Sequence, residues 1–407
     1  MKKLGFGKLL LLGAALLATS CASPSSTSKD TVKVGLICLH DSSSTYDRNF
    51  IDSMGVAVSH LEGIVEGAPV IMTDVDESNE CFTAAKELVR KGCDVVFADS
   101  FGHEDFLMQA AQEYPNVTFC HATGTKAKVA GIKNYHNAFA SIYEGRYLAG
   151  YAAGLRLQSM IANNELEAAN YDEAGNIRLG YIGAFPYAEV VSGYTAWYLG
   201  VKEAVSNVVM DVTFTSSWYN YDAEMAGVVV LANRGAAIIS QHADSMGAPG
   251  ECESRGIPNI TYNVSTENEC PNTYVAYSKI DWAPYYEAVI KAIAENRAIE
   301  GEVNNNYTGT LHTGSVKYEA KDPTAQAALD AMKDELVAGT RKVFDCSKFT
   351  VNGEHLTSYL ADVDDMGDFQ PETEAIKTEN GITFFNESAM RSAPYFDLNI
   401  DGINKLN

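Results

Sequence analysis

Short apolar runs alternate with amphipathic helical patterns through most of the chain, and this alternation constrains the fold more than any other feature. The first set of predicted strands covers residues 32–39, 70–75, 95–98 and 117–121. Helical patterns lie between them at residues 49–64, 81–90 and 106–112. Strands and helices that alternate at this spacing predict βαβ units and therefore a parallel sheet.

A second run of the same kind follows a long helical pattern at residues 143–161 and a polar, loop-like stretch at residues 163–176. Its predicted strands cover residues 177–184, 208–216, 236–241, 259–264 and 274–280. Its predicted helices cover residues 190–205, 223–233, 250–255, 283–295 and 322–338. Two such runs in 407 residues predict an α/β protein with two doubly wound parallel-sheet lobes.

The boundaries of these lobes follow from the two runs. We expect residues 32–140 to form the first lobe, with residues 270–298 returning to it. Residues 141–265 should form the second lobe, together with residues 300–345, and residues 346–407 a C-terminal extension. Hinge crossovers are expected near residues 137–143, 264–274 and 298–302.

The N-terminus predicts export. Three lysines precede an apolar run at residues 9–18, which leads through small residues to Cys21. This is the pattern of a secretory signal, and the run is too short to span a bilayer. A cysteine at this place favours a lipobox, with Cys21 as the lipidated first residue and residues 22–31 as a polar tether. The alternative is a plain signal peptide with an incidental cysteine.

Charge and cysteine content exclude several classes of function. The chain has 30 basic and 53 acidic residues, a net charge of −23, which disfavours a nucleic-acid partner and, more weakly, an anionic ligand. Seven cysteines remain besides Cys21, without a CxxC motif, and this odd number disfavours a zinc site or a disulfide framework. Only Cys252 and Cys270 merit consideration as a bridged pair. We expect no metal and no cofactor.

Aromatic and polar residues occur together just after several predicted strands, where ligands bind in doubly wound sheets. The candidates at these strand ends are Thr45, Tyr46, Asp47, Ser100, Phe101, Phe185, Trp218, Asp244 and Asn263. A planar, polar, uncharged ring suits this mixture, because aromatic rings stack on its faces and carboxylates or amides bind its edge. Each residue also has an ordinary role open to it. An aromatic side chain commonly packs in the core, and Asp47 or Asp99 can cap a helix.

Known catalytic motifs are missing from the sequence. No Gly-rich phosphate loop follows the first strand, and no GxSxG, HExxH or Walker motif is present. Candidates for acid–base work are His40, His103, His121 and His242, but none accompanies a nucleophile in a recognisable motif. We therefore expect a binding protein and not an enzyme.

Six short motifs resemble those of the basic-membrane-protein family and stand in the same order. They are HATG at 121–124, YEGRYLAG at 143–150, GAFP at 183–186, SW at 217–218, QHADS at 241–245 and WAPYY at 282–286. The resemblance runs from about residue 32 to 345 and implies a substrate-binding lipoprotein of an ABC importer, with a type I periplasmic-binding fold. It is similar to the branch associated with purines, which implies capture of a purine base or nucleoside and delivery to permease subunits.

The resemblance also implies roles for particular residues. The family's first-loop contacts match Thr45, Tyr46 and Asp47. Its later strand-end contacts match Ser100, Phe101, Trp218 and Asp244, and the WAPYY motif adds Trp282 to the candidates. One departure is that Ser43 and Ser44 stand where the branch usually has Gly-Trp, so one stacking ring is missing.

Two other functions remain open at this point. A ligand-sensing lipoprotein that engages a membrane receptor would have the same sequence features, and the same fold could bind riboflavin or a sugar. Hydrolysis of a nucleoside is a third alternative, and it predicts turnover.

Overall fold

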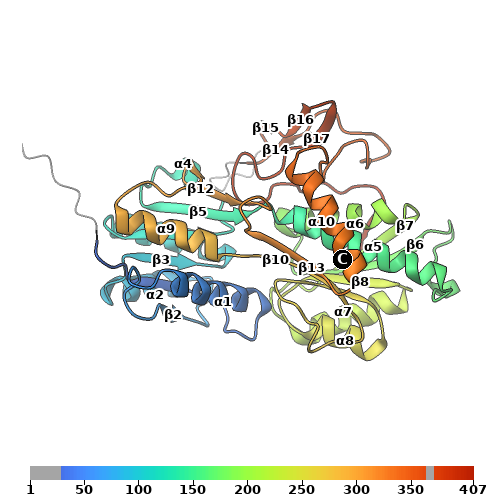
Figure 1. The fold of residues 1–407 in the computed structure, drawn as a ribbon, viewed down its shortest axis with the longest axis horizontal. Coiled ribbons are helices and arrows are strands. Elements are labelled where there is room, and N and C mark those ends of the chain that lie inside the picture. The colour runs from blue at the N-terminus through green and yellow to red at the C-terminus, as the bar shows by residue number, and fades with distance from the viewer. Residues whose placement is uncertain (1–28, 364–370) are drawn as a thin grey trace, which may run out of the picture.

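The computed structural model describes residues 29–363 and 371–407. Two α/β lobes lie side by side, each around a seven-stranded sheet (Figure 1). The predicted arrangement of two doubly wound lobes is confirmed. The signal segment and Cys21 lie outside the described residues. Within them, no helix is long and apolar enough to cross a membrane.

The first lobe has the strand order β11-β12-β5-β4-β3-β1-β2. These strands are β1 Val34–Ile37, β2 Val70–Met72, β3 Val95–Ala98, β4 Thr118–Ala122, β5 Tyr135–Ala140, β11 Glu302–Val303 and β12 Asn306–Gly309. All neighbours pair in parallel except β11 with β12. Both β1 and β3 are buried along their whole length, as expected for a parallel sheet covered on both faces.

Helices cover both faces of this first sheet. They are α1 Thr45–His60, α2 Asn79–Arg90, α3 Glu104–Glu113, the short α4 Ala127–Ala130 and α9 Ala283–Glu295. Leu36 points toward the core that holds α1 and α9, whereas Ile37 points toward the core that holds α2 and α3. This alternation follows from the two-residue period of a strand.

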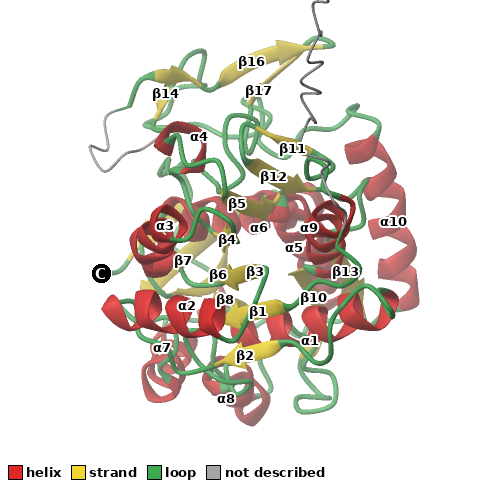
Figure 2. Cartoon of the chain, turned by 90° about the vertical axis from the view of Figure 1, so that its left-hand side faces the viewer, coloured by secondary structure: helices red, strands yellow, loops and turns green. Residues whose placement is uncertain are grey.

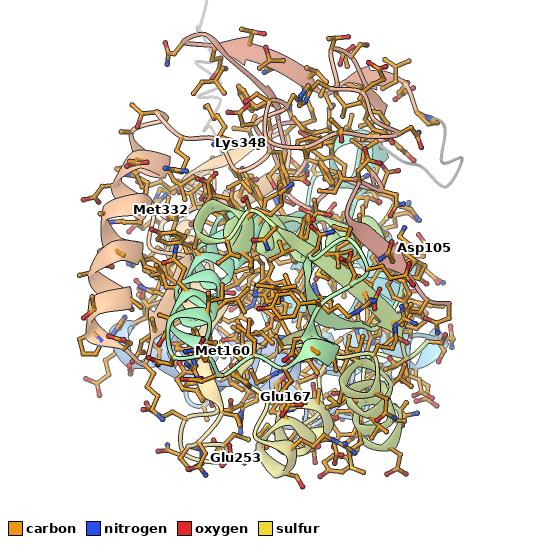
Figure 3. All side chains as sticks on the ribbon, turned by 90° about the vertical axis from the view of Figure 1, so that its right-hand side faces the viewer. Asp105, Met160, Glu167, Glu253, Met332 and Lys348 are labelled. Carbon is orange, nitrogen blue, oxygen red and sulfur yellow. The ribbon has the colours of Figure 1, made fainter. Side chains whose placement is uncertain are left out.

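The second lobe has the strand order β13-β10-β9-β8-β6-β7-β18. These strands are β6 Ile177–Gly183, β7 Val208–Phe214, β8 Ile238–His242, β9 Asn259–Tyr262, β10 Tyr274–Ile280, β13 Val316–Ala320 and β18 Ile403–Lys405. Its helices are α5 Ile142–Ala162, α6 Ala188–Ala204, α7 Tyr221–Asn233, α8 Gly247–Arg255 and α10 Pro323–Val337. Figure 3, seen from this lobe, shows Met332 of α10 at one side, and Glu253 of α8 at the bottom.

The segments that return between lobes are divided differently from the prediction. Strand β10 pairs with β9 and so belongs to the second sheet, although residues 270–298 were assigned to the first lobe. Strand β12 pairs with β5 in the first sheet, although residues 300–345 were assigned to the second. The chain therefore crosses at residues 140–142, 280–283 and 309–316. Polar residues marked the loops, but the strand with which each returning segment pairs decides its lobe.

The C-terminal extension folds over one side of both lobes (Figures 1 and 2). It contains β14 Leu360–Ala361, β15 Thr373–Glu374, β16 Ile376–Glu379 and β17 Ile382–Phe385, and it ends in β18. Phe344 stacks on Phe396 with ring centroids 4.3 Å apart, and Phe385 packs edge-on against Phe396. The extension therefore has an aromatic core continuous with the second lobe.

Helices α5 and α6 make the closest helix contact in the second lobe. A Cβ atom on Gly150 would lie 2.0 Å from the carbonyl oxygen of Trp197, and one on Gly200 would lie 2.1 Å from that of Tyr147. Neither position accepts a side chain unless the helices separate.

We expect Gly150→Ala to lower the free energy of unfolding by about 1–3 kcal/mol, the usual cost of overpacking. The matched control is Gly55→Ala on α1, where an added Cβ meets nothing within 4 Å. Because alanine favours a helix over glycine, that variant should gain roughly 0.5–1 kcal/mol. Urea unfolding measures both, and equal stabilities of the two variants would contradict the packing argument.

Candidate functional site

Strands of both lobes end at the cleft between them, and a small cavity lies there. The first lobe contributes Leu39, His40, Tyr46, Asp47, Ser100, Phe101 and Thr123. The second lobe contributes Glu189, Trp218, His242 and Asp244. The cavity volume is about 20 Å³. A water needs roughly 10–15 Å³, so any larger ligand requires the lobes or the rings to part.

The structure brings six of the predicted site residues to this cavity: Tyr46, Asp47, Ser100, Phe101, Trp218 and Asp244. Two more lie directly behind its wall. The backbone N–H of Thr45 donates to the carbonyl oxygen of Asp244 at 2.7 Å. The ring of Phe185 packs edge-on against Trp218 at 5.1 Å.

Two predicted residues lie away from the cavity lining. Trp282 is 2% exposed and stacks on Phe50, with ring centroids 4.3 Å apart, in the core of the first lobe. Asn263 is buried with a φ of 71°, and its backbone N–H donates to the carbonyl oxygen of Ser278. Both residues therefore have packing or backbone roles in this structure.

Sequence reasoning did not name several of the lining residues. His40 and His242 were considered only as acid–base candidates, although His40 follows β1 closely and His242 is the last residue of β8. Glu189 stands in the first turn of α6, where an acidic residue commonly balances the helix dipole. Its position just after the β6 loop was the available signal. Thr123 follows β4 directly and offered the same signal.

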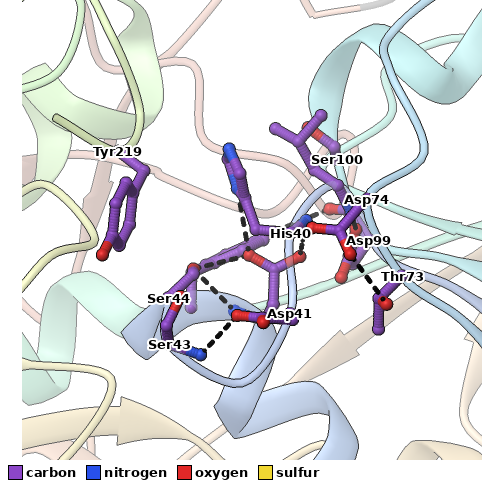
Figure 4. Close-up of polar contacts among 12 residues, drawn as sticks. His40, Asp41, Ser43, Ser44, Thr73, Asp74, Asp99, Ser100 and Tyr219 are labelled. Carbon is purple, nitrogen blue, oxygen red and sulfur yellow. Dashed lines mark hydrogen bonds and ion pairs between the residues drawn. The ribbon is translucent and has the colours of Figure 1, made fainter.

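Two buried carboxyl groups, Asp47 and Asp99, lie close together in the first lobe, with ligand atoms within 4.8 Å of each other. Figure 4 shows Asp99, His40 and Ser44 in this group of polar contacts. Asp47 accepts hydrogen bonds from the His40 backbone N–H at 2.9 Å and from the Ser44 hydroxyl at 2.5 Å. Asp99 accepts from the Leu39 backbone N–H at 3.2 Å. Ser44, and not Asp47, is the N-cap of α1. Asp99 therefore ties the end of β3 to the end of β1, and Asp47 ties the loop after β1 to the first turn of α1.

Their proximity changes the protonation of Asp99. Burial and then the negative charge of Asp47 raise the pKa of Asp99 well above its ordinary value. At His40 burial lowers the pKa, but the hydrogen bond and charge of Asp47 outweigh it, and the net pKa is raised. A proton on Asp99 thus relieves the repulsion between two buried carboxylates.

Cys38, Asp47 and Asp99 also satisfy the spacing of a metal site, because one ligand atom from each lies within 4.8 Å of the others. Burial and the nearby Asp99 raise the pKa of the Cys38 thiol. Metals bind the deprotonated forms of a thiol and a carboxyl group, so a cation at this cluster would have to displace both protons.

The second lobe adds further acidic groups. Burial, followed by the charges of Asp47 and Glu224, raises the pKa of Asp244 well above its ordinary value. His242 Nε2 lies 3.4 Å from Glu189 Oε1, and burial lowers the pKa of His242. The cavity lining therefore holds three acidic side chains and two histidines, and its carboxyl oxygens can accept hydrogen bonds from a ligand.

Contacts across the cleft show that the lobes are closed. Phe101 stacks on Tyr187 of the second lobe with centroids 5.5 Å apart and an interplanar angle of 28°. The ring centroids of His40 and Tyr219 lie 5.6 Å apart. Together with the hydrogen bond from Thr45 to Asp244, these contacts hold the two cavity walls in register.

Comparison with known proteins gives the family. Residues 35–343 match the Bmp family, described as "ABC transporter substrate-binding protein PnrA-like". The chain belongs to this family. The resemblance predicted from the six motifs is confirmed.

Two curated relatives bind different ligands according to their names. A purine-binding protein of Brucella abortus is 29% identical over 250 residues, which cover 61% of this chain and 62% of the relative. A Haloferax volcanii protein, provisionally named as an ABC transporter glucose-binding protein, is 25% identical over 280 residues, 67% of this chain and 65% of the relative. The chain thus matches less than two thirds of the length of either protein.

Among solved structures, an ABC transporter solute-binding protein from Conexibacter woesei has a TM-score of 0.57 at 17% identity. The match covers 77% of this chain and 98% of that protein. At this identity the likeness establishes the fold alone, and it confirms the predicted periplasmic-binding architecture of the Bmp-family chain.

The raised pKa of Asp99 predicts how stability depends on pH. The folded state keeps a proton that the unfolded state loses in the ordinary carboxyl range, so the free energy of unfolding should fall as pH rises through the raised pKa. Asp99→Asn carries a neutral amide of similar size at every pH. Between pH 5 and pH 8, the free energy of unfolding of the variant should therefore fall less than that of the wild type. Urea unfolding measures both. Parallel pH profiles for the variant and the wild type would contradict the assignment.

Proposed function

We propose that this Bmp-family protein is an extracytoplasmic, lipid-anchored component of an ABC importer that captures a purine base or nucleoside. The observation that carries the proposal is the arrangement of the cavity walls. Tyr46 and Phe101 line it from the first lobe, and Trp218 lines it from the second. Flat rings from opposite lobes, with carboxyl groups in the same lining, suit a planar heterocycle that donates hydrogen bonds.

The charge of the cavity narrows the ligand class. Asp47, Glu189 and Asp244 are acceptors for ring or exocyclic N–H groups, or for hydroxyl groups of a sugar. The same acidic groups repel a phosphate, so nucleotides fit poorly. The purine-binding relative from Brucella abortus supports this choice of ligand.

The proposed mechanism is closure around the ligand. A ligand that touches both lobes binds the closed form better than the open form and shifts the population toward it. The hydrogen bond from Thr45 to Asp244 and the stack of Phe101 on Tyr187 form only when the lobes are closed. The closed pair of lobes then presents one surface to the permease subunits. This role requires no bond to be made or broken.

A sugar is the second candidate, because one relative carries glucose in its name. An indole ring such as Trp218 also packs against a sugar face, and carboxylates accept from the hydroxyl groups of the sugar.

Calorimetry with adenine, guanine, hypoxanthine, their nucleosides and glucose separates the candidates. Binding of glucose without any purine would replace the purine proposal, and release of free base from a nucleoside would replace the binding role with hydrolysis. A sensor that feeds a membrane receptor would bind the same ligands, and loss of uptake on deletion distinguishes transport.

Trp218→Ala should weaken all bound purines alike, by roughly 1–3 kcal/mol or about ten- to a hundredfold in Kd, because stacking does not depend on the edge groups. Tyr171→Ala, an exposed tyrosine remote from the cleft, is the control and should bind as the wild type does. If Trp218→Ala lowers thermal stability and leaves every Kd unchanged, Trp218 has only a packing role.

Asp244→Asn should change the ranking of the purines as well as weaken binding. The substitution keeps the size of the side chain but replaces one acceptor by a donor, so ligands that donate to this position lose most. Calorimetry across the same purines measures the ranking. A uniform loss for every ligand, or none, would show that Asp244 does not meet the ring edge.

Cys21→Ser should release the protein from the membrane without loss of ligand binding. The attached lipid supplies the membrane affinity in this proposal, at about 0.8 kcal/mol per buried CH₂ group. Fractionation of cells followed by a salt wash measures the distribution. A variant that remains with the membranes would contradict the lipid anchor.

A further inference from the structure

A second and larger cavity adjoins the first. Its volume is about 280 Å³, and it shares Phe101, Thr123 and Glu189 with the small cavity, so these three residues lie at the boundary between the two, called the neck below. Its far wall comes from the C-terminal extension. The extension residues that line it include Asp362, Arg391, Ala393 and Asp397. These residues lie beyond the part of the chain that matches the family, which ends at residue 343.

Hydrogen bonds attach this wall to the second lobe. The buried carboxylate of Glu387 accepts from the backbone N–H groups of Tyr395 at 2.8 Å and Phe396 at 2.9 Å. It also accepts from the hydroxyl of Ser192 at 3.0 Å. Ser192 lies on α6, the helix whose first turn carries Glu189 at the neck.

The same segment is attached to the first lobe. Asn306 Oδ1, on β12, accepts from both the backbone N–H and the hydroxyl of Ser392, at 3.1 and 3.0 Å. Residues 387–397 therefore bind both lobes and hold Ala393 and Asp397 at the cavity. A wall fixed at two places is preorganised for a ligand.

The lining of the second cavity indicates the chemistry that it accepts. Three carboxyl groups, from Glu189, Asp362 and Asp397, outnumber the one guanidinium of Arg391. The Thr123 hydroxyl donates to the carbonyl oxygen of Ala122, so its oxygen can accept from a ligand. Carboxylates and hydroxyl oxygens match the donors of an uncharged polyol and disfavour a phosphate.

We propose that residues 387–397 are a third wall of the ligand site, and that the second cavity takes the uncharged, hydroxyl-bearing substituent of a ring bound in the first. The ligand class is thus a heterocycle with an attached sugar, in preference to the free base. The inference rests on the proposed function, because the ring must occupy the first cavity.

The test fills the second cavity from the extension. Ala393 is buried and lines the cavity, so Ala393→Leu places extra bulk in it. The matched control is Ala389→Leu, on the same segment but exposed and outside this cavity. Calorimetry compares adenine with adenosine, and guanine with guanosine. In Ala393→Leu the Kd for each nucleoside should rise roughly tenfold or more, as overpacking predicts, while the Kd for each base changes less than about threefold. The control should leave all four values unchanged.

A second variant tests the same proposal in case Ala393→Leu does not fold. Asp397 is exposed, so Asp397→Asn should fold and still weaken nucleosides about three- to tenfold by loss of a charged hydrogen-bond acceptor. Equal losses for base and nucleoside, no loss in either variant, or a wild type that binds bases and rejects nucleosides would overturn the third wall alone. A wild type that binds none of the four compounds would contradict the proposed function and this inference together.

Discussion

Parallel strand pairing is the constraint on which the rest of the structure depends. Because β1 pairs in parallel with β3, and β6 with β8, their carboxyl ends meet at one edge of each sheet. The two edges face each other across the cleft. Residues that are far apart in the sequence, such as Tyr46, Phe101, Trp218 and Asp244, thereby line one cavity without any local signal that links them.

Burial of acidic groups is the second determinant of this site. A carboxylate removed from water is costly unless hydrogen bonds or a proton compensate. Asp47 receives hydrogen bonds from His40 and Ser44, whereas burial and the charge of Asp47 raise the pKa of Asp99 and so favour its protonated form. The cleft thus combines fixed acceptors with aromatic faces. The whole chain carries a net charge of −23, which disfavours an anionic ligand.

The sequence predicted elements well where hydrophobic pattern alone decides them. The bounds predicted for β3, β10 and α9 agree with the structure, because each is an apolar run with clear breaks at both ends. Strand β5 was missed, since its polar Asn137 resembles a loop residue. In the structure that amide is buried and accepts from the backbone N–H of Ala127 at 2.7 Å. Only the tertiary partner makes the residue compatible with a strand.

The sequence predicted which residues follow the ends of strands, but it did not predict which of them line the cavity. Trp218 and Trp282 both follow strands, and the local sequence does not separate them. Phe50 covers Trp282 from α1, whereas Trp218 remains at the cavity. The position of the C-terminal extension could not be predicted from the sequence either. Its hydrogen bonds to Asn306 and Ser192 join residues that are 86 and 195 positions apart. Long-range pairing of this kind leaves no periodic pattern in the sequence.

The central claim is that the cleft binds a purine-containing ligand, and the ligand carried by the native protein tests it most directly. Protein purified without added ligand would be denatured, and the released small molecules identified and quantified by mass spectrometry. The account predicts a purine nucleoside or base in an amount that approaches one per chain. Release of a sugar, an amino acid or riboflavin in that amount would contradict the purine assignment.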